Sequence, residues 1–469
     1  MKATSVRANW TDEKLDGFKL RGDHLADEVV AKLVDGWDAC ADSARNDANL
    51  KSIQQAFGVL RPLALNGEIP AYLARHAASA GLDAEMARLV DACDTLPAWA
   101  DLKKIERAEQ LFRDSGVVSC ILFFCACLPE VYAVPDISIV LHATGNLEKM
   151  TDQRIRATSA MILSVLLPGG VRRSMGAGRP KVLKARFIHA IMRHLFLRGN
   201  AAELAAAGPI AVPALPTAGA DNIFRRAYAH GWQSAHEGVP CNQEELSYTL
   251  LTFGYVFLRG LRRLGLGFAK ADEEAYLHLW NVVGHLLGIE PDMMAHTMID
   301  AAELFSLLQK RALARGFEND PRPLLGEALV ASIEKSISHR LLKPVAALVI
   351  EYLSSEATAQ GLGLRQRFSF SAQCLFGAAM GAIKSFDWLV RRLLPNFSLA
   401  RFILRVAGYQ LVHAVLTDTT NPIDLPEAAR KQINAMLGEW SSDQHAPRWM
   451  NQVEDYFTTK GNWRESIGV

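Results

Sequence analysis

The chain has 469 residues, half of them hydrophobic, and its 51 Lys and Arg nearly balance its 50 Asp and Glu. This length allows a large core and two or three domains, whereas the balanced charge disfavours nucleic-acid binding and gives no overall field toward an anionic membrane. The first residues contain no apolar run that could serve as a signal-peptide core, so we expect a cytoplasmic protein. Seven cysteines without a CxxC pair are typical of free thiols in a reducing compartment.

Apolar residues recur at helical spacing along almost the whole chain, and alternating strand patterns are scarce. We therefore predict an all-α, multi-helix globular fold. The predicted helices with recognisable start or stop signals are Thr11–Asp35, Ala84–Asp94, Leu102–Ser115, Thr151–Leu167, Lys181–Leu197, Gln243–Leu264, Ala271–Leu287 and Glu290–Ala314.

The longest apolar run, Val117–Val134, is interrupted by Pro129 and Glu130 before it reaches membrane-spanning length. We interpret it as a buried helix and predict no transmembrane segment. Its cysteines, Cys120, Cys125 and Cys127, have no histidine or further cysteine at zinc-site spacing, so they are interpreted as small apolar side chains.

Breaker residues divide the helical pattern. Pro168-Gly169-Gly170 ends one helix, residues 176–180 form a joint before the next, and the Ala, Pro and Gly of 201–220 predict a loop. A second cluster, Glu318-Asn-Asp-Pro-Arg-Pro, follows the central helices, and the polar stretch after Trp440 is expected at the surface. We predict an N-terminal helical segment (1–95), a central core (96–325) and a C-terminal helical region packed on that core (326–469), together forming one compact unit.

One histidine lies in the middle of an apolar helical face, in Ala185-Arg-Phe-Ile-His189-Ala-Ile-Met-Arg193. Val182, Met192 and Phe196 share the face of His189, so a single imidazole is aimed at the interior. A buried imidazole needs a partner, which can be a backbone carbonyl, a carboxylate or a metal. From these residues alone, a hydrogen-bonded core histidine is the more common case.

Two further segments could carry chemistry. Arg154 and Thr158 share one face of the helix predicted over 151–167, where they can present a cation and a hydroxyl to the rim of a pocket. The alternative is an arginine in a salt bridge and a threonine bonded to its own backbone. His278 and His285 lie two turns apart on another predicted helix, about 10 Å by helix rise. That separation is too large for one metal ion, so they are interpreted as supporting or structural residues.

Helix ends explain two remaining motifs. Asn242 is expected to accept a hydrogen bond from the backbone N–H of Glu245 and so to begin a helix. The glycine-rich stretch from Gly260 lacks a preceding strand and the spacing of a phosphate loop, and it is interpreted as a helix end followed by a turn.

Several segments, taken in order, resemble the family of haem-dependent oxygenases that includes latex clearing protein and the mpaB-type oxygenases. The resemblance covers roughly residues 90–310. The matching segments are Leu96-Pro-Ala-Trp99-Ala-Asp101, Ala143-Thr144-Gly145-Asn-Leu, Arg154-Ile-Arg-Ala-Thr158, Ala185-Arg-Phe-Ile-His189-Ala-Ile-Met-Arg193, Val239-Pro-Cys-Asn242-Gln243-Glu244 and Gly260–Gly265 leading to His278-Leu-Trp280-Asn-Val-Val-Gly284-His285.

The resemblance implies an all-helical fold around a b-type haem, with His189 as the axial ligand of the iron. It also implies that Arg154 and Thr158 lie on the distal side, where they would act on bound dioxygen. Arg193 in the same segment as His189, and Arg172 and Arg173 after the Pro-Gly-Gly break, are candidates for contact with the cofactor. For Arg172 and Arg173, charge-assisted bonds to haem propionates and an exposed loop position are alternatives.

One departure affects the expected reaction. Ala157 stands where latex clearing proteins have a lysine that can occupy the distal iron position. The expected activity is therefore addition of dioxygen to an apolar, isoprenoid or lipid-like alkene with oxidative cleavage, and rubber itself is the less favoured substrate. A haem-binding sensor, carrier or peroxidase-like protein without oxygenase turnover is the alternative.

Overall fold

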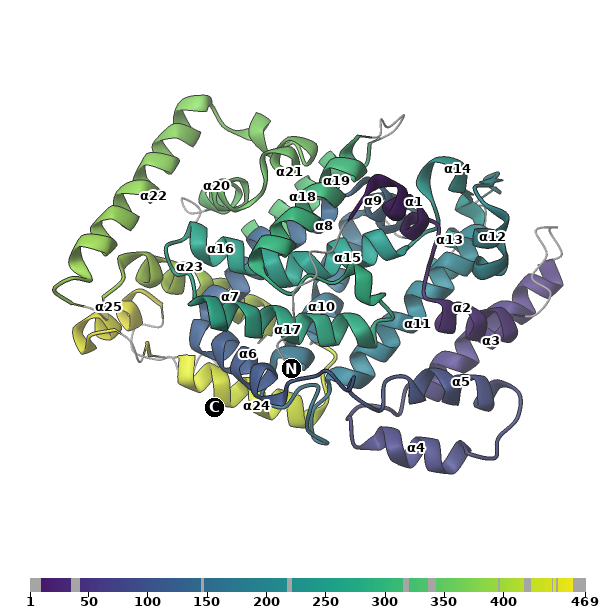
Figure 1. Ribbon diagram of the computed structural model, residues 1–469. Coiled ribbons are helices and arrows are strands. Elements are labelled where there is room, and N and C mark those ends of the chain that lie inside the picture. Colours follow the sequence, from purple (N-terminus) through teal and green to yellow (C-terminus); the bar gives the residue numbers. More distant parts are fainter. Residues whose placement is uncertain are drawn as a thin grey trace.

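Helices build almost the whole protein (Figure 1). The structure, a computed structural model, describes residues 10–34, 43–144, 147–216, 222–314, 320–335, 343–394, 397–416, 423–440, 442–443 and 446–458. Within these ranges the only strands are β1 (Ala211–Val212) and β2 (Trp232–Gln233), which pair antiparallel with Ala211 opposite Gln233. The all-α prediction is confirmed.

The N-terminal helices are α1 (Asp12–Lys19), α2 (His24–Leu33), α3 (Ser43–Leu60), α4 (Glu68–His76) and α5 (Leu82–Asp91). The prediction of one helix over 11–35 was wrong, because the chain breaks between α1 and α2. Asp23 begins α2 by accepting a hydrogen bond from the backbone N–H of Ala26. At Gly22 a Cβ atom would lie only 2.3 Å from Nε of Arg193, so this break accommodates a side chain from a distant helix.

The central helices are α6 (Leu102–Ser115), α7 (Val117–Leu122), η1 (a π-helical turn, Phe123–Cys127), α8 (Leu128–Tyr132), α9 (Pro135–Ala143), α10 (Leu147–Leu166) and α11 (Gly178–Leu197). The Val117–Val134 run is buried, as predicted. The helix α10 ends before Pro168-Gly169-Gly170, and α11 begins in the predicted joint.

The next elements are α12 (Ala201–Ala207), α13 (Ile223–His230), α14 (Ser234–Glu237), α15 (Gln243–Leu251), η2 (a π-helical turn, Thr252–Val256), α16 (Phe257–Arg263), α17 (Lys270–Leu286), η3 (Pro291–Met293) and α18 (Met298–Leu313). Asn242 accepts from the N–H of Glu245 at 3.0 Å, and Gly265 follows α16 with φ +76°, so both helix-end predictions are confirmed.

Two local predictions in this region were wrong. The helix α12 occupies part of the loop predicted over 201–220, because Asn200 accepts hydrogen bonds from the first N–H groups of that helix; residues 217–220 lie outside the described residues. The helix predicted from Glu290 begins instead at Met298, because Pro291 starts only a single 3-10 turn and Thr297 caps α18 by accepting from the N–H of Asp300.

The C-terminal elements are α19 (Arg322–Lys335), α20 (Lys343–Leu353), α21 (Glu356–Gly361), η5 (Leu364–Arg367), α22 (Phe370–Val390), α23 (Leu399–Leu416), α24 (Glu427–Trp440) and α25 (Arg448–Thr458). Glu318 and Asn319 of the predicted terminator cluster lie outside the described residues.

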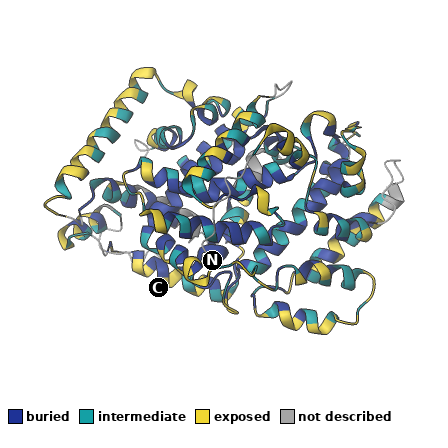
Figure 2. Cartoon of the chain, viewed as in Figure 1, coloured by how far each residue is buried: buried dark blue, intermediate teal, exposed yellow. Residues whose placement is uncertain are grey.

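Two apolar clusters form the interior (Figure 2). One joins the central helices to the C-terminal helices, and it includes Leu404 and Trp440. The other packs the N-terminal helices against α11, with Phe187 and Ile191 fully buried. The helix α11 therefore supports one cluster while it contacts α10 and α17 of the other. The three-part division at 95/96 and 325/326 stays a prediction.

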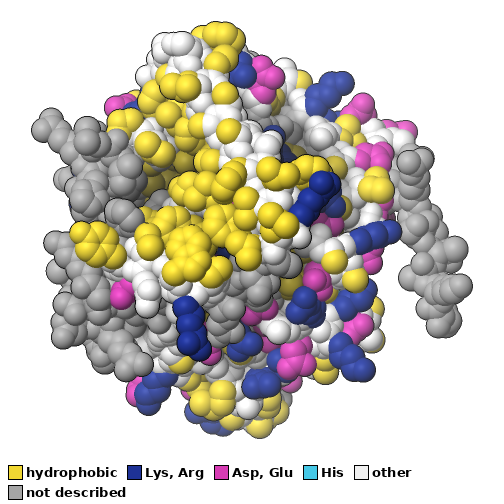
Figure 3. All heavy atoms as spheres, turned by 90° about the vertical axis from the view of Figure 1, so that its left-hand side faces the viewer, with side chains coloured by type: hydrophobic (Ala, Val, Ile, Leu, Met, Phe, Trp, Pro, Cys, Tyr) yellow, Lys and Arg dark blue, Asp and Glu magenta, His cyan; other side chains and the backbone are white. Residues whose placement is uncertain are grey.

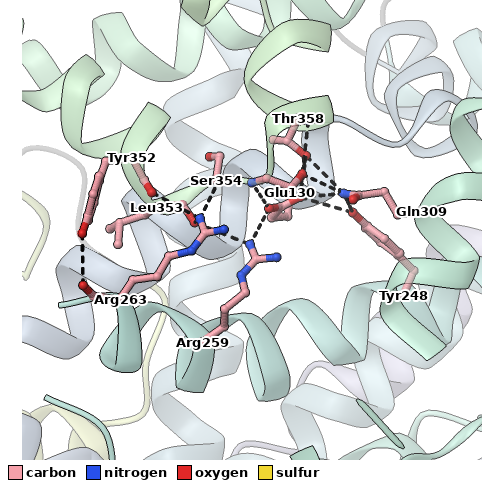
Figure 4. A network of polar contacts seen from close by, with 10 residues as sticks. Glu130, Tyr248, Arg259, Arg263, Gln309, Tyr352, Leu353, Ser354 and Thr358 are labelled. Carbon is pink, nitrogen blue, oxygen red and sulfur yellow. Dashed lines mark hydrogen bonds and ion pairs between the residues drawn. The ribbon is translucent and has the colours of Figure 1, made fainter. Parts of the chain in front are cut away.

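A buried carboxylate fastens the C-terminal helices to the centre (Figure 4). Glu130 of α8 is fully buried and pairs with Arg259 of α16 at 2.5 Å. It also accepts hydrogen bonds from Gln309 of α18 at 2.9 Å and from the backbone N–H of Ser355 at 2.6 Å. The hydroxyl of Thr358 in α21 donates to the same carboxylate.

Arg263 makes a second link beside it. Its Nη1 atom donates to the carbonyl oxygens of Leu353 and Ser354 at 2.7 and 2.6 Å, at the end of α20 (Figure 4). A cation at this position satisfies carbonyls that the helix itself leaves unpaired.

None of the described helices has by itself the length and apolarity of a membrane span. The helices Leu102–Ser115 and Val117–Tyr132 together meet that criterion as a pair bent by 94°, and the second of them lies in the core.

Candidate functional site

The predicted site residues come from two neighbouring helices. Arg154 and Thr158 lie one turn apart on α10, and His189 lies near the middle of α11. The two helices pack against each other. The structure therefore brings together the two elements that carry the three residues.

His189 has unusual surroundings for an interior residue. Its neighbours Phe187, Ala190 and Ile191 are fully buried, whereas the imidazole lies deep in the protein but keeps some accessible surface. The surrounding side chains therefore do not enclose the imidazole completely. Its Nδ1 atom is buried and has no hydrogen-bond partner in the part of the chain that the structure describes.

The electrostatics keep this imidazole neutral. Burial, and next the nearby Arg193 cation, lower the pKa of His189 to about 4. Near pH 7 the ring is therefore uncharged and has a lone pair on one nitrogen. A neutral imidazole is the form that binds a metal.

Two arginines flank His189 on α11 and tie it to α2. Arg186, three residues before the histidine, donates to Asp23 with an Nη2–Oδ1 distance of 2.8 Å. Arg193, four residues after it, is fully buried and pairs with Asp27 at 2.5 Å, and it also donates to the carbonyl of Cys241 at 2.7 Å. These contacts fix how α11 is rotated, and so where His189 points.

Arg154 has a polar partner but no carboxylate. Its Nη2 atom donates to Oγ1 of Thr144 at 2.8 Å, and that hydroxyl donates to the carbonyl of Val140 at 2.7 Å. Burial lowers the pKa of the guanidinium, and no described carboxylate lies within ion-pair distance of it. The guanidinium remains protonated near neutral pH. Its charge is therefore available to stabilise negative charge that develops beside it.

Thr158 follows Arg154 by one turn and keeps a partly accessible side chain. The adjacent residue, Ser159, lines a small apolar cavity of about 30 Å³ together with Phe123, Phe124 and Ile162. The hydroxyl of Ser159 donates to the carbonyl of Ile155 in its own helix. This part of α10 therefore carries the hydroxyl groups of Thr158 and Ser159, and Ser159 borders an apolar cavity.

The three arginines expected at the cofactor differ in their surroundings. Arg172 is held by Glu109 and Glu106 of α6, with Nη2 at 3.0 and 2.9 Å from their carboxylates. Arg193 is engaged by Asp27, as described above. Arg173 is exposed. The structure therefore leaves Arg173 the most accessible of the three.

The histidines of α17 contact the segment Leu96–Asp101, which is one of the segments that resemble the oxygenase family. Nε2 of His278 accepts from the backbone N–H of Asp101 at 2.8 Å, and the ring of Trp99 meets His278 and His285 edge-on at 5.6 and 6.0 Å between centroids. Asn281 donates to the carbonyl of Ala295 at 2.8 Å. These contacts agree with the interpretation of the α17 residues as supporting or structural.

Sequence reasoning missed the partners of these residues. Thr144 was part of a quoted segment, but nothing in that segment shows that its hydroxyl binds Arg154. Asp23 and Asp27 lie more than 160 residues before the arginines that they bind. Buried arginines at positions three before and four after a histidine are the one signal that acidic partners were needed.

Known proteins resemble this chain in sequence and in fold. Residues 219–385 match the family described as "ER-bound oxygenase mpaB/B'/Rubber oxygenase, catalytic domain". The rubber oxygenase of Streptomyces sp. (strain K30) is 24% identical over 330 residues, which cover 67% of this chain and 71% of that protein. A structure of latex clearing protein in the closed state matches with a TM-score of 0.62 at 18% identity, covering 87% of this chain and 95% of that one.

The matched region belongs to the MPAB/Lcp catalytic-domain family, and the chain is a distant homologue of rubber oxygenase. Its fold is that of latex clearing protein. The structural match extends well beyond residues 219–385, so it includes most of the helices described above.

Proposed function

We propose that this protein is a b-type haem oxygenase that adds dioxygen to an apolar alkene and cleaves it. Membership of an oxygenase family gives the class of reaction. The observation that carries the proposal is the neutral imidazole of His189, which lies deep in the protein, keeps some accessible surface and has no partner among the described residues for its buried Nδ1 atom.

The residues present fit a haem. A single histidine supplies one ligand, and among the described residues no group of three or more His, Cys, Asp or Glu is arranged to hold a metal ion. His189 would hold the iron of a haem, and the porphyrin would supply the ligands that the protein does not. Bound haem supplies the iron chemistry that activates dioxygen.

The chain's own residues would then hold and polarise the reactants. His189 holds the cofactor, and Arg186 and Arg193 orient the helix that carries it. Arg154, positioned by Thr144, and the hydroxyl of Thr158 are proposed to stabilise developing negative charge on the oxygen atoms. Arg173 is the arginine that remains available for a propionate group.

The proposal of an apolar substrate rests on the family resemblance. The apolar cavity lined by Phe123, Phe124 and Ile162 beside Ser159 has a volume of about 30 Å³, which is room for a water molecule and not for an alkene. Ala157 cannot supply the amino group that the family's lysine provides, so we propose a small alkene, isoprenoid or lipid-like, in preference to a polymer. The buried free thiols Cys93, Cys120 and Cys127 fit the proposed cytoplasmic location.

Turnover tests the proposal. The purified protein, reduced and supplied with ¹⁸O₂ and a panel of apolar alkenes, is expected to give carbonyl products that carry ¹⁸O. Because Arg154 is proposed as a fixed donor, Arg154→Gln should lower the rate by about a hundredfold while haem content is unchanged. Thr144→Val should lower it in the same direction, because the guanidinium loses its positioning partner.

Arg156→Gln on the same helix is the matched control and should keep the wild-type rate. A full complement of haem without any carbonyl product from the panel would contradict the oxygenase proposal and favour the sensor, carrier or peroxidase-like alternative.

A further inference from the structure

The helix α22 stands at one edge of the molecule, with α20 and α23 against one side of it and solvent on the other (Figure 1). Several large apolar side chains on its outward side are exposed to solvent. Phe370, Leu375 and Leu389 are 81, 72 and 57% exposed, and Leu393, just past its end, is 84% exposed. A Cβ atom added at Gly377 or Gly381 would meet nothing within 4 Å, so this side of the helix is open.

The apolar surface continues onto the C-terminal helix. Trp449 of α25 is 55% exposed and stacks on Phe397, whose ring meets Phe386 of α22 at 6.1 Å between centroids. Figure 3 shows hydrophobic side chains gathered across this face, with Lys and Arg beside them. We call this surface the α22 face, defined by Phe370, Leu375, Trp388, Leu389, Leu393 and Trp449.

The charges around the α22 face have one dominant sign. Residues 364–394 contain five basic side chains, at 365, 367, 384, 391 and 392, and one acid, Asp387. Lys384 and Arg392 form no ion pair with a described carboxylate; Arg392 lies over the ring of Trp388 at 3.8 Å.

Acids of this region either pair with its arginines or are buried. Glu356 and Glu334 form ion pairs with Arg365 and Arg367. Asp387 is buried and accepts hydrogen bonds from Ser398 Oγ at 2.8 Å and from the N–H of Leu399 at 2.7 Å, at the start of α23. Asp443 and Glu454 are buried and pair with Arg401 and Arg405. Arg365, Arg367 and Arg391 thus have carboxylate partners, and Lys384 and Arg392 are the two cations of this stretch that pair with no described carboxylate.

We propose that the α22 face binds the surface of a membrane that contains anionic phospholipids, with α22 lying in the plane of the interface. An exposed apolar helix flanked by cations and by Trp residues has the chemistry of an interfacial anchor. Acidic lipid headgroups would supply the negative charge that Lys384 and Arg392 do not receive from a described carboxylate. A second copy of the chain is a poorer partner, because symmetric pairing of two such faces would bring like charges together.

This proposal goes beyond the oxygenase activity and does not require it, so it is tested by lipid binding. The full chain is sedimented with vesicles of phosphatidylcholine alone and with vesicles that also contain phosphatidylserine. We expect binding to the second kind, weakened by added salt. The variant Leu375→Glu/Leu393→Glu should bind at least about tenfold more weakly, because it places carboxylates on the buried side of the contact.

Two controls match these changes. Ile299→Glu alters an apolar residue that is 72% exposed on α18, away from the α22 face, and should bind as the wild type does. Lys384→Gln/Arg392→Gln should weaken binding to phosphatidylserine vesicles, whereas Lys103→Gln on α6 should not.

The exposed thiol of Cys374 on α22 reports the geometry. A fluorophore attached there, with Cys40 replaced by serine, should be quenched by lipids that carry a shallow spin label. Equal binding by the wild type and the Leu375→Glu/Leu393→Glu variant, or binding without quenching, would overturn the proposal. Absence of vesicle binding would also overturn it. If the protein instead forms a dimer in solution that Leu393→Glu dissociates, the α22 face is assigned to contact with a second copy of the chain.

Discussion

His189 and His194 lie five residues apart on α11, and burial acts on both in the same direction. It lowers the pKa of His189 to about 4 and that of His194 to about 3. His189 shares a face with the two arginines that α2 holds, and it keeps more accessible surface than His194, which is 3% exposed. His189 is therefore the candidate ligand, whereas His194 is a histidine of the core whose protonation is opposed by burial.

The depressed pKa of His194 predicts acid sensitivity. Below pH 6.5 the unfolded chain binds a proton that the folded chain binds only near pH 3, so stability falls as the pH is lowered through this window. One proton contributes at most about 1.4 kcal/mol per pH unit to the free energy of unfolding. Urea unfolding of His194→Gln between pH 5 and pH 6.5 should therefore show a flatter pH dependence than the wild type.

The exposed His24 provides the control for this effect, and His24→Gln should leave the slope unchanged. An identical slope in the wild type and in His194→Gln would show that His194 takes up its proton equally in both states.

Residue patterns in the sequence predicted the features that depend on neighbouring residues, namely the direction of side chains on a helix and the start of a helix. The interior aim of His189 and the shared face of Arg154 and Thr158 follow from helical periodicity alone, and the helix start at Asn242 follows from its side-chain oxygen. Their partners do not follow in this way. Thr144 reaches Arg154 across the break between α9 and α10, and Asp27 reaches Arg193 from another helix, so the contacts depend on the tertiary fold.

At the scale of elements, helix boundaries that depend on local sequence were predicted, and those that depend on distant contacts were not. Pro168-Gly169-Gly170 ends α10 as expected because a proline and glycines disfavour a helix wherever they occur. The break between α1 and α2 was missed because its cause is distant: Gly22 leaves room for the Arg193 side chain. The start of α18 was placed too early because Pro291 can begin a single turn as well as a helix.

The Glu130 network predicts that the C-terminal helices depend on one carboxylate. Because Glu130→Gln leaves Arg259 without its buried counter-charge, we expect a loss of about 3–5 kcal/mol in the free energy of unfolding. Amide hydrogen exchange should rise first in α20 and α21, since Gln keeps only one of the two oxygens and either the backbone N–H of Ser355 or the hydroxyl of Thr358 loses its acceptor. Chemical denaturation and exchange measured by mass spectrometry check the two effects.

Glu356→Gln provides the comparison, because that residue forms an exposed pair with Arg365 and should cost less than about 1 kcal/mol. Similar small losses in both variants would show that the network does not hold the C-terminal helices in place.

At the scale of the whole molecule, composition and periodicity were sufficient for the fold class. An all-α protein with a buried Val117–Val134 segment was predicted and is present. The average charge was a poor guide to the surface, because it concealed the basic, apolar α22 face. Long-range contacts decide such features: Asp387, Asp443 and Glu454 are buried against partners that sequence patterns do not identify.

The same scale explains why the oxygenase proposal needs several elements at once. The helix α2 fixes the rotation of α11, α11 carries His189, and α10 carries Arg154 and Thr158 against it. No single segment of the sequence contains this arrangement. The family resemblance along residues 90–310 implied roles for residues of α10 and α11, but it did not include α2.

The central claim is that His189 binds the iron of a haem, and absorption spectroscopy of haem-loaded protein tests it most directly. The wild type and His285→Ala should show the same Soret band and haem content. His189→Gly should lose both and regain them when free imidazole is added, because the small ligand can enter the space that the side chain vacates. Equal haem content in the wild type and in His189→Gly without imidazole would contradict the assignment.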